Sequence, residues 1–171
     1  MNVGEEVHEH AEHAKAPFDK RVAATMAGIA AALAVVAVFG HLSTTEELLN
    51  QQKASDQWSY YQAKNIRRYE SEIAKDLLAA MKGDKEADYQ KNAERYRKEA
   101  DEIQEKAKEF EEESHMAGRR ALRFHFGEIF LEMGIVFASL AILTKREIMW
   151  VVAVVGAVIG IVLATTAALI H

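Results

Sequence analysis

Residues 89–124 read YQKNAERYRKEADEIQEKAKEFEEESHMAGRRALRF, and this stretch decides the fold. Small and larger apolar side chains recur along it at alternating steps of four and three residues. This is the heptad spacing of a helix that packs lengthwise against another helix. The predicted seam consists of Tyr89, Ala93, Tyr96, Ala100, Ile103, Ala107, Phe110, Ser114, Ala117, Ala121 and Phe124.

The stretch before this seam is expected to form the partner helix. Gly40 and His41 are predicted to interrupt the chain, and a capping box, Ser43–Glu46 or Thr44–Glu47, to start the new helix. Its expected contact stripe has steps of three and four residues. The stripe consists of Trp58, Gln62, Ile66, Tyr69, Ile73, Leu77 and Ala80.

The two helices are predicted to have equal lengths. Residues 44–82 and 85–123 would each be about 58 Å long at 1.5 Å per residue, and Gly83 and Asp84 are typical of a tight turn. We therefore expect residues 43–123 to form an antiparallel coiled-coil hairpin with its turn near 82–84. The side chains expected to fill its seam are Trp58, Tyr61, Tyr96, Ile103 and Phe110.

Three apolar stretches flank this polar insert and predict an all-α membrane protein with three transmembrane helices. The predicted spans are 20–40, 124–143 (continuous with the hairpin) and 148–170, preceded by an acidic, histidine-bearing tail at 1–19. A signal peptide is the alternative for the first stretch. It would need a long acidic leading region, and no A-x-A cleavage site follows.

The basic residues favour a cytoplasmic N-terminus and a periplasmic hairpin, because cytoplasmic ends of spans carry excess Lys and Arg. Arg119, Arg120 and Arg123 lie on the hairpin side and weigh against this orientation. The residues that support it are Lys15, Lys20, Arg21, Lys145 and Arg146.

His125, Glu128 and Glu132 share one face of the predicted second span and are the candidate functional residues. Glu132 would lie roughly 19 Å from Lys145, well inside the hydrocarbon. An ionised carboxylate there is costly, so it should face protein, water or a partner. The alternatives are a proton or cation path, a metal site shared between subunits, and a structural polar cluster that fixes the helix register.

Two further groups of residues are candidate sites. His8, His10 and His13 in the acidic tail are weak candidate metal ligands, because a solvated acidic tail explains them better. Small residues spaced four apart permit close packing of membrane helices. These candidate packing residues are Gly28, Gly156, Gly160 and Ala164.

The composition excludes several functions. The net charge of −5 argues against a nucleic-acid partner, and the absence of cysteine leaves no disulfide framework. We find no nucleophile–base constellation and no glycine-rich phosphate loop, so the chain is expected to be no enzyme and to hold no cofactor. The expected partners are the lipid bilayer and further copies of the chain, and an unidentified protein at the hairpin is left open.

The segment Lys53–Lys64 (KASDQWSYYQAK), together with Lys15–Phe18 (KAPF) and Thr144–Glu147 (TKRE), resembles a family of bacterial three-span membrane proteins. That family is catalogued as domain of unknown function 4337. The resemblance covers essentially the whole chain and implies a location in the bacterial inner membrane. It implies no activity, cofactor or catalytic residue.

Two functions remain as hypotheses. The first is a non-enzymatic, homo-oligomeric scaffold or partner-docking assembly built from hairpins. The second is a small ion- or proton-conducting assembly that uses Glu132 and its neighbours.

Overall fold

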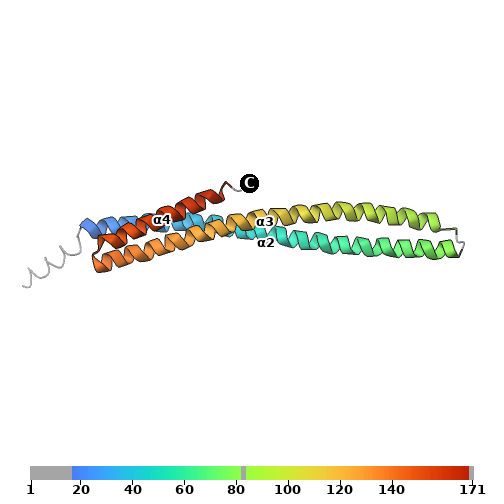
Figure 1. Ribbon diagram of the computed structural model, residues 1–171, viewed down its shortest axis with the longest axis horizontal. Coiled ribbons are helices and arrows are strands. Elements are labelled where there is room, and N and C mark those ends of the chain that lie inside the picture. The colour runs from blue at the N-terminus through green and yellow to red at the C-terminus, as the bar shows by residue number, and fades with distance from the viewer. Residues whose placement is uncertain (1–16, 82–83, 170–171) are drawn as a thin grey trace, which may run out of the picture. The chain divides into compact units, whose positions relative to one another are not determined.

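The computed structural model describes residues 17–81 and 84–169, which are almost entirely helical and contain no strand. The helices are α2 (Pro17–Ala80), α3 (Glu86–Thr144) and α4 (Glu147–Ala167), shown in Figure 1. Each is long and apolar enough, over part of its length, to cross a membrane. The all-helical prediction is confirmed at this level. The tail at 1–16 and residues 82 and 83 of the predicted turn lie outside the described residues.

Helix α2 is continuous through Gly40 and His41, so the predicted interruption is wrong. Gly40 is buried, and a Cβ atom built on it would lie 3.3 Å from Cβ of Phe124 in α3. The glycine therefore gives α3 room to approach. An interior glycine costs a helix only about 1 kcal/mol relative to alanine, and here the packing of the two helices outweighs that cost. Ser43 is a buried residue inside the helix rather than a cap.

Helix α3 is also continuous, as expected, and a short link joins it to α4. Lys145 adopts the left-handed conformation with φ 56°, and Arg146 is extended at the start of α4. Lys145 Nζ lies 2.5 Å from Asp19 Oδ2 of α2. The link and the first turns of α2 are thereby held together.

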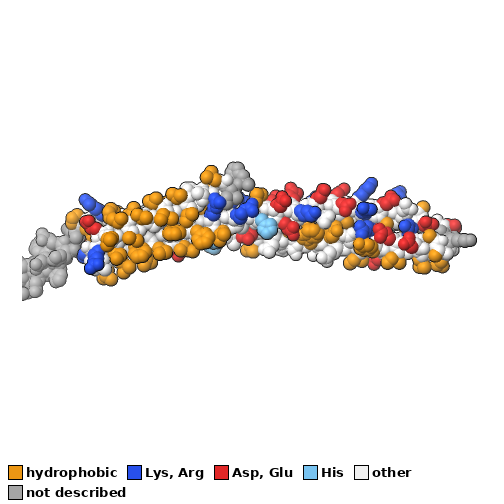
Figure 2. Space-filling model, viewed as in Figure 1, with side chains coloured by type: hydrophobic (Ala, Val, Ile, Leu, Met, Phe, Trp, Pro, Cys, Tyr) orange, Lys and Arg blue, Asp and Glu red, His pale blue; other side chains and the backbone are white. Residues whose placement is uncertain are grey.

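The chain divides into two compact units that share α2 and α3. The first unit contains the chain up to Ser43 and from Arg119 onward, and its core forms where three helices meet. That core consists of two clusters of buried residues: Ile29, Val36, Leu131, Ala157 and Ala164, and Val22, Ala138, Ala141 and Ala153. The face of this unit seen in Figure 2 is covered mainly by hydrophobic side chains.

The second unit, Thr44–Gly118, consists of the later part of α2 packed antiparallel against the early part of α3. Ser114 Oγ donates to the backbone oxygen of Glu47 at 3.1 Å, and Lys64 Nζ donates to Glu99 Oε2 at 2.6 Å. The α3 side of the contact matches the predicted seam. Ala93, Ala100, Ile103, Ala107, Ser114 and Ala117 are buried, and Tyr89, Tyr96 and Phe110 are half-buried.

The α2 side differs from the prediction. Of the expected stripe, Trp58 is half-buried, whereas Ile66, Tyr69, Ile73 and Leu77 are all more than half exposed. Tyr61, which was also expected in the seam, is half-buried. It belongs to a set of residues, again with alternating steps of three and four, that is buried or half-buried and faces α3. We call this set the polar row: Glu47, Asn50, Ala54, Gln57, Tyr61, Lys64, Arg68, Ser71, Lys75 and Leu78.

The polar row packs well because its partner residues on α3 are small. The long stems of Lys and Arg cover apolar surface while their charged ends remain hydrated or paired. Lys64 illustrates this arrangement: its ammonium group lies 5.3 Å from the ring centroid of Tyr60 and 5.5 Å from that of Tyr96, and it is bound by Glu99. The contact face of α2 is therefore amphipathic rather than apolar.

Candidate functional site

The candidate site lies on α3 in the first unit, where His125, Glu128 and Glu132 follow one another along the helix. His125 Nδ1 and Glu128 Oε2 are 2.9 Å apart, a hydrogen bond between residues three positions apart. The Glu128 side chain is 20% exposed and the His125 side chain 47%. Which of the two atoms donates in this bond depends on the tautomer of the histidine ring.

Glu128 is further defined by its neighbours on α2. A Cβ atom on Gly40 would lie 3.6 Å from Glu128 Oε1, so this carboxylate approaches the glycine surface of α2. The adjacent Phe39 and Phe124 rings stack with centroids 6.0 Å apart. Glu128 thus bonds to His125 on its own helix and lies close to Gly40 of α2.

Glu132 does not join this pair. Its side chain is exposed on the surface of the first unit, and it makes no hydrogen bond or ion pair with another described residue. Its neighbours along the exposed face, Ile129, Met133 and Val136, are apolar and about half exposed. The structure therefore brings together two of the three predicted residues and leaves the third as an isolated carboxylate on an apolar surface.

The residues described do not form a metal centre. No group of three or more His, Cys, Asp or Glu side chains in 17–81 and 84–169 is arranged to hold an ion. The weak metal candidates His8, His10 and His13 lie outside the described residues. His125 and Glu128 alone would supply only two ligands, fewer than a structural or catalytic zinc site requires.

The small residues of α4 pack against α3 at very short range. A Cβ atom on Gly160 would lie 2.7 Å from the backbone oxygen of Gly127, and one on Gly127 would lie 2.9 Å from the backbone oxygen of Gly160. Ala164 is buried beside them. Gly160 and Ala164 thus serve as predicted within the chain, and Gly127 is a packing residue that the sequence reasoning missed.

Gly28 and Gly156 have more space around them than Gly160. Among the residues that the structure describes, a Cβ atom on Gly28 would meet nothing within 4 Å, and one on Gly156 would meet only the backbone oxygen of Phe130, at 3.5 Å. The described residues therefore make no close contact with a Cβ atom at Gly28, and its role in close packing stays a prediction.

Polar contacts at the two ends of the first unit also went unnoticed in the sequence. Trp150 Nε1 donates to Thr25 Oγ1 at 3.2 Å, near the Lys145–Asp19 pair. At the other end Arg123 Nη1 donates to the backbone oxygen of Thr166 at 3.1 Å. The Lys145–Asp19 pair has a signal in the sequence, because these opposite charges lie just before the last and the first apolar stretch. Nothing local in the sequence indicates that Arg123 reaches the last turn of α4.

Residues 18–170 match the family described as Domain of unknown function (DUF4337), and the chain belongs to this family. The match spans nearly the whole chain and confirms the resemblance seen in Lys53–Lys64. No curated protein and no solved structure matches the chain.

Proposed function

We propose that this protein is a non-enzymatic membrane scaffold that assembles from several copies of the chain and presents their helical hairpins outside the bilayer. The observation that carries the proposal is the exposed carboxylate of Glu132 on an apolar helix face. Such a side chain needs a polar partner when the helix is in lipid. The described part of its own chain supplies none, so a second copy is the simplest source of one.

The spacing of the polar contacts supports three spans at 20–40, 124–143 and 148–170. Arg123 of α3 and Lys145, which directly follows this helix, are 22 residues apart, which corresponds to about 33 Å at the helical rise. The hydrocarbon core of a bilayer is about 30 Å thick. The Lys145–Asp19 pair and the Arg123–Thr166 bond would then lie at opposite interfaces.

Glu132 lies near the middle of the span in this placement. It is nine residues from Arg123 and thirteen from Lys145, or about 13 Å and 19 Å at the helical rise. Leaving an ionised carboxylate in lipid at this depth costs about 2.5–3.5 kcal/mol on insertion scales. A contact that protonates or pairs the carboxylate between copies would remove much of this cost, which favours assembly.

We further propose a bacterial inner-membrane location with the N-terminus in the cytoplasm and the hairpin in the periplasm. The support is the family resemblance and the positive charge of Lys20, Arg21, Lys145 and Arg146 at one end of the spans.

A second candidate function, conduction of protons or cations, rests on the same exposed Glu132. In an assembly, carboxylates from several copies could line a hydrated path instead of pairing with protein. The two functions make different predictions for the Glu132→Gln variant. The experiment measures the native mass in lipid nanodiscs and the proton flux into liposomes, for the parent chain and for this variant.

For a scaffold, the parent chain is multimeric and carries no proton flux, and Glu132→Gln shifts the mass distribution towards smaller species. The matched control is Glu128→Gln on the same helix, which leaves Glu132 intact. A parent flux that Glu132→Gln abolishes while assembly persists would replace the scaffold with the conduction function. A monomeric parent chain would contradict both.

A further inference from the structure

The hairpin carries an apolar face that it does not use for its own folding. Ile66, Tyr69, Ile73 and Leu77 of α2 are 58%, 53%, 68% and 60% exposed. We call these four residues the outer stripe. Each is two residues away from a member of the polar row (Lys64, Ser71 or Lys75), and two residues rotate a side chain by about 200° around a helix. The polar row faces α3, so the outer stripe faces away from it.

The surroundings of the outer stripe are acidic. Glu70 lies three residues before Ile73, and Asp76 three residues after it; both are exposed. Glu70 makes no ion pair with another described residue, and Asp76 pairs only with its neighbour Lys75, at 3.3 Å. Contiguous exposed apolar side chains with a charged rim are typical of a protein–protein contact.

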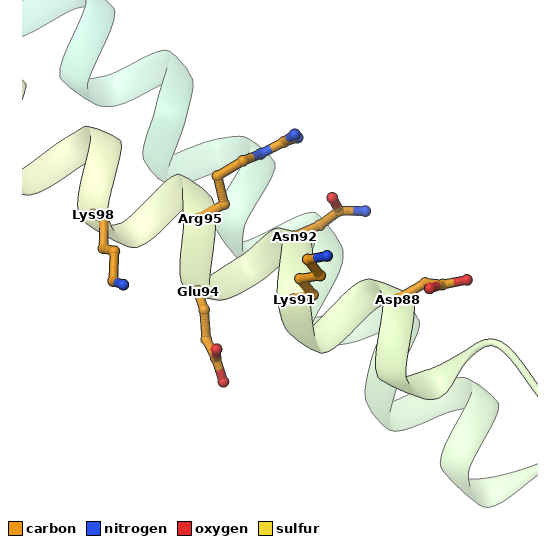
Figure 3. A pocket seen from close by; sticks show the side chains of 6 residues that line it. All are labelled: Asp88, Lys91, Asn92, Glu94, Arg95 and Lys98. Carbon is orange, nitrogen blue, oxygen red and sulfur yellow. The ribbon is translucent and has the colours of Figure 1, made fainter.

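The outward face of α3 at this level carries three basic side chains, with the acidic Asp88 and Glu94 beside them. Lys91, Arg95 and Lys98, which we call the basic patch, are each two residues from the buried Ala93 or Ala100 and therefore point away from α2. Lys91 and Lys98 make no ion pair with another described residue, and Arg95 contacts Glu99 of its own helix at 3.7 Å. Figure 3 shows six labelled side chains of this part of α3, which project from the helix in different directions. Asp88, Lys91, Asn92, Glu94, Arg95 and Lys98 line an open pocket of about 660 Å³.

The outer stripe and the basic patch lie at the same height along the hairpin. The Lys64–Glu99 ion pair fixes the register of the two helices. From this level, Ile73 is nine residues further along α2 and Lys91 is eight residues back along α3, which correspond to about 13 Å and 12 Å in the same direction. Two hairpins standing side by side with the same polarity would therefore place the stripe of one level with the patch of the next.

We propose that the outer stripe of one copy docks on the basic patch of a second copy. The aliphatic stems of Lys91, Arg95 and Lys98 cover the apolar side chains, and their charged ends reach Glu70 and Asp76 of the neighbour. The proposal rests on the scaffold function, because copies inserted with one topology in one bilayer have their hairpins on the same side of it, with both ends of each hairpin at the membrane. The stripe and the patch lie on opposite sides of the hairpin, so the contact is head to tail and repeats from copy to copy, closing a ring or extending a row.

Cysteine cross-linking tests this contact without background, because the chain contains no cysteine. The test protein is the full chain in its native membrane with Ile73→Cys and Asp88→Cys together. Asp88 lines the same pocket as the basic patch, and its replacement leaves all three basic residues in place. The two cysteines of one chain point to opposite sides of the hairpin, so they cannot form an internal disulfide without large movement.

Mild oxidation is expected to give a ladder of dimers, trimers and larger species for the double variant and only monomers for each single variant. The matched control joins Ile73→Cys with Glu105→Cys. Glu105 is also exposed and two residues from a buried seam residue, Ala107, but it lies about 22 Å from the level of Ile73 along the hairpin. This pair is expected to give no ladder.

Every other outcome overturns the proposal. A dimer from Ile73→Cys alone would mean that two stripes pair with each other, and equal ladders from both double variants would mean random collision. Absence of cross-links in a parent protein of multimeric native mass would refute the docking faces and leave self-association intact. A parent protein of monomeric native mass would refute the scaffold function as well.

Discussion

The two units of this protein pack their helices with different kinds of side chain. In the first unit, glycine and alanine bring α3 and α4 together until Gly127 and Gly160 face each other's backbone, and the outward side chains are apolar. In the second unit, small residues of α3 accept the long polar side chains of α2, and the large apolar residues of α2 are turned outward. The comparison teaches that an apolar stripe on a helix does not by itself identify the face that packs within its own chain.

The largest expected effect is on assembly, from a charge placed in the outer stripe. Ile73→Asp removes an isoleucine contact worth about 1.5–3 kcal/mol on burial and adds a carboxylate beside Glu70 and Asp76. We expect self-association to weaken by at least about tenfold, since each 1.4 kcal/mol corresponds to a factor of ten. Native mass measured in nanodiscs across a concentration series reports the change.

The matched control for this variant is Ser59→Asp, an exposed position two residues from Gln57 and Tyr61 of the polar row. It places the same charge on the outward face of α2 outside the stripe, so its assembly should equal that of the parent. Both variants should keep the parent's helical circular dichroism. Equal loss of assembly in the two variants would show that the outward face responds to charge in general.

The next effect is on the stability of the first unit. Gly160→Ala places a Cβ atom 2.7 Å from the backbone oxygen of Gly127, a contact that only a backbone shift can relieve. Overpacking of this kind typically costs 1–3 kcal/mol, so the midpoint of unfolding in detergent should fall. The matched control Gly28→Ala meets no described residue within 4 Å and gains only the helix propensity of alanine, so it should unfold at or slightly above the parent's midpoint. A stable Gly160→Ala variant would refute the close crossing of α3 and α4.

A smaller effect is expected from the tryptophan at the start of α4. Trp150→Phe keeps the aromatic packing but removes the hydrogen bond from Nε1 to Thr25 Oγ1. A single hydrogen bond contributes about 0.5–1.5 kcal/mol. The double-mutant cycle with Thr25→Val isolates this contribution, and additive losses from the two substitutions would contradict a direct interaction between them.

The smallest effect at neutral pH is expected in the second unit, at the Lys64–Glu99 ion pair. The hydrogen bond from Lys64 is the main cause that lowers the pKa of the Glu99 carboxyl from its ordinary value. A lowered pKa in the folded state contributes stability that is present above the unfolded pKa. This contribution is lost as the pH falls through the folded value.

Glu99→Gln should therefore reduce the difference in stability between neutral and acidic pH. Thermal unfolding followed by circular dichroism at several pH values measures the slope, and Glu102→Gln is the matched control, because Glu102 is an exposed residue of the same helix that has no ion pair with another described residue. Identical slopes for the parent and Glu99→Gln would contradict the role of Lys64 in holding this carboxylate ionised.

The sequence was sufficient to predict the helices and the packing face of α3, because heptad spacing and long apolar stretches are local signals. It was not sufficient for the packing face of α2. There Ile66, Ile73 and Leu77 form the more apolar stripe, yet Lys64 and Ser71 face α3, because the alanines of α3 leave space that long or small polar side chains fill. Periodicity indicates which residues share a face, and only the partner helix decides which face is used.

The candidate site could likewise be predicted only in part. The spacing of His125 and Glu128 along one helix predicted their contact, since residues three apart are neighbours on a helix surface. The exposure of Glu132 could not be predicted from α3 alone, because it depends on where α2 and α4 lie around the helix. The prediction for Gly40 was wrong for the same reason. This glycine lies where α2 and α3 approach each other closely, and it does not mark the end of a helix.

The rate at which a cysteine at position 73 reacts with a water-soluble maleimide in native membranes tests the central claim most directly. The account predicts that Ile73→Cys is labelled many times more slowly than Ser59→Cys, and that the two rates become equal once detergent and denaturant dissociate and unfold the protein. Equal rates in the intact membrane would mean that water reaches the outer stripe freely and that no neighbouring molecule covers it.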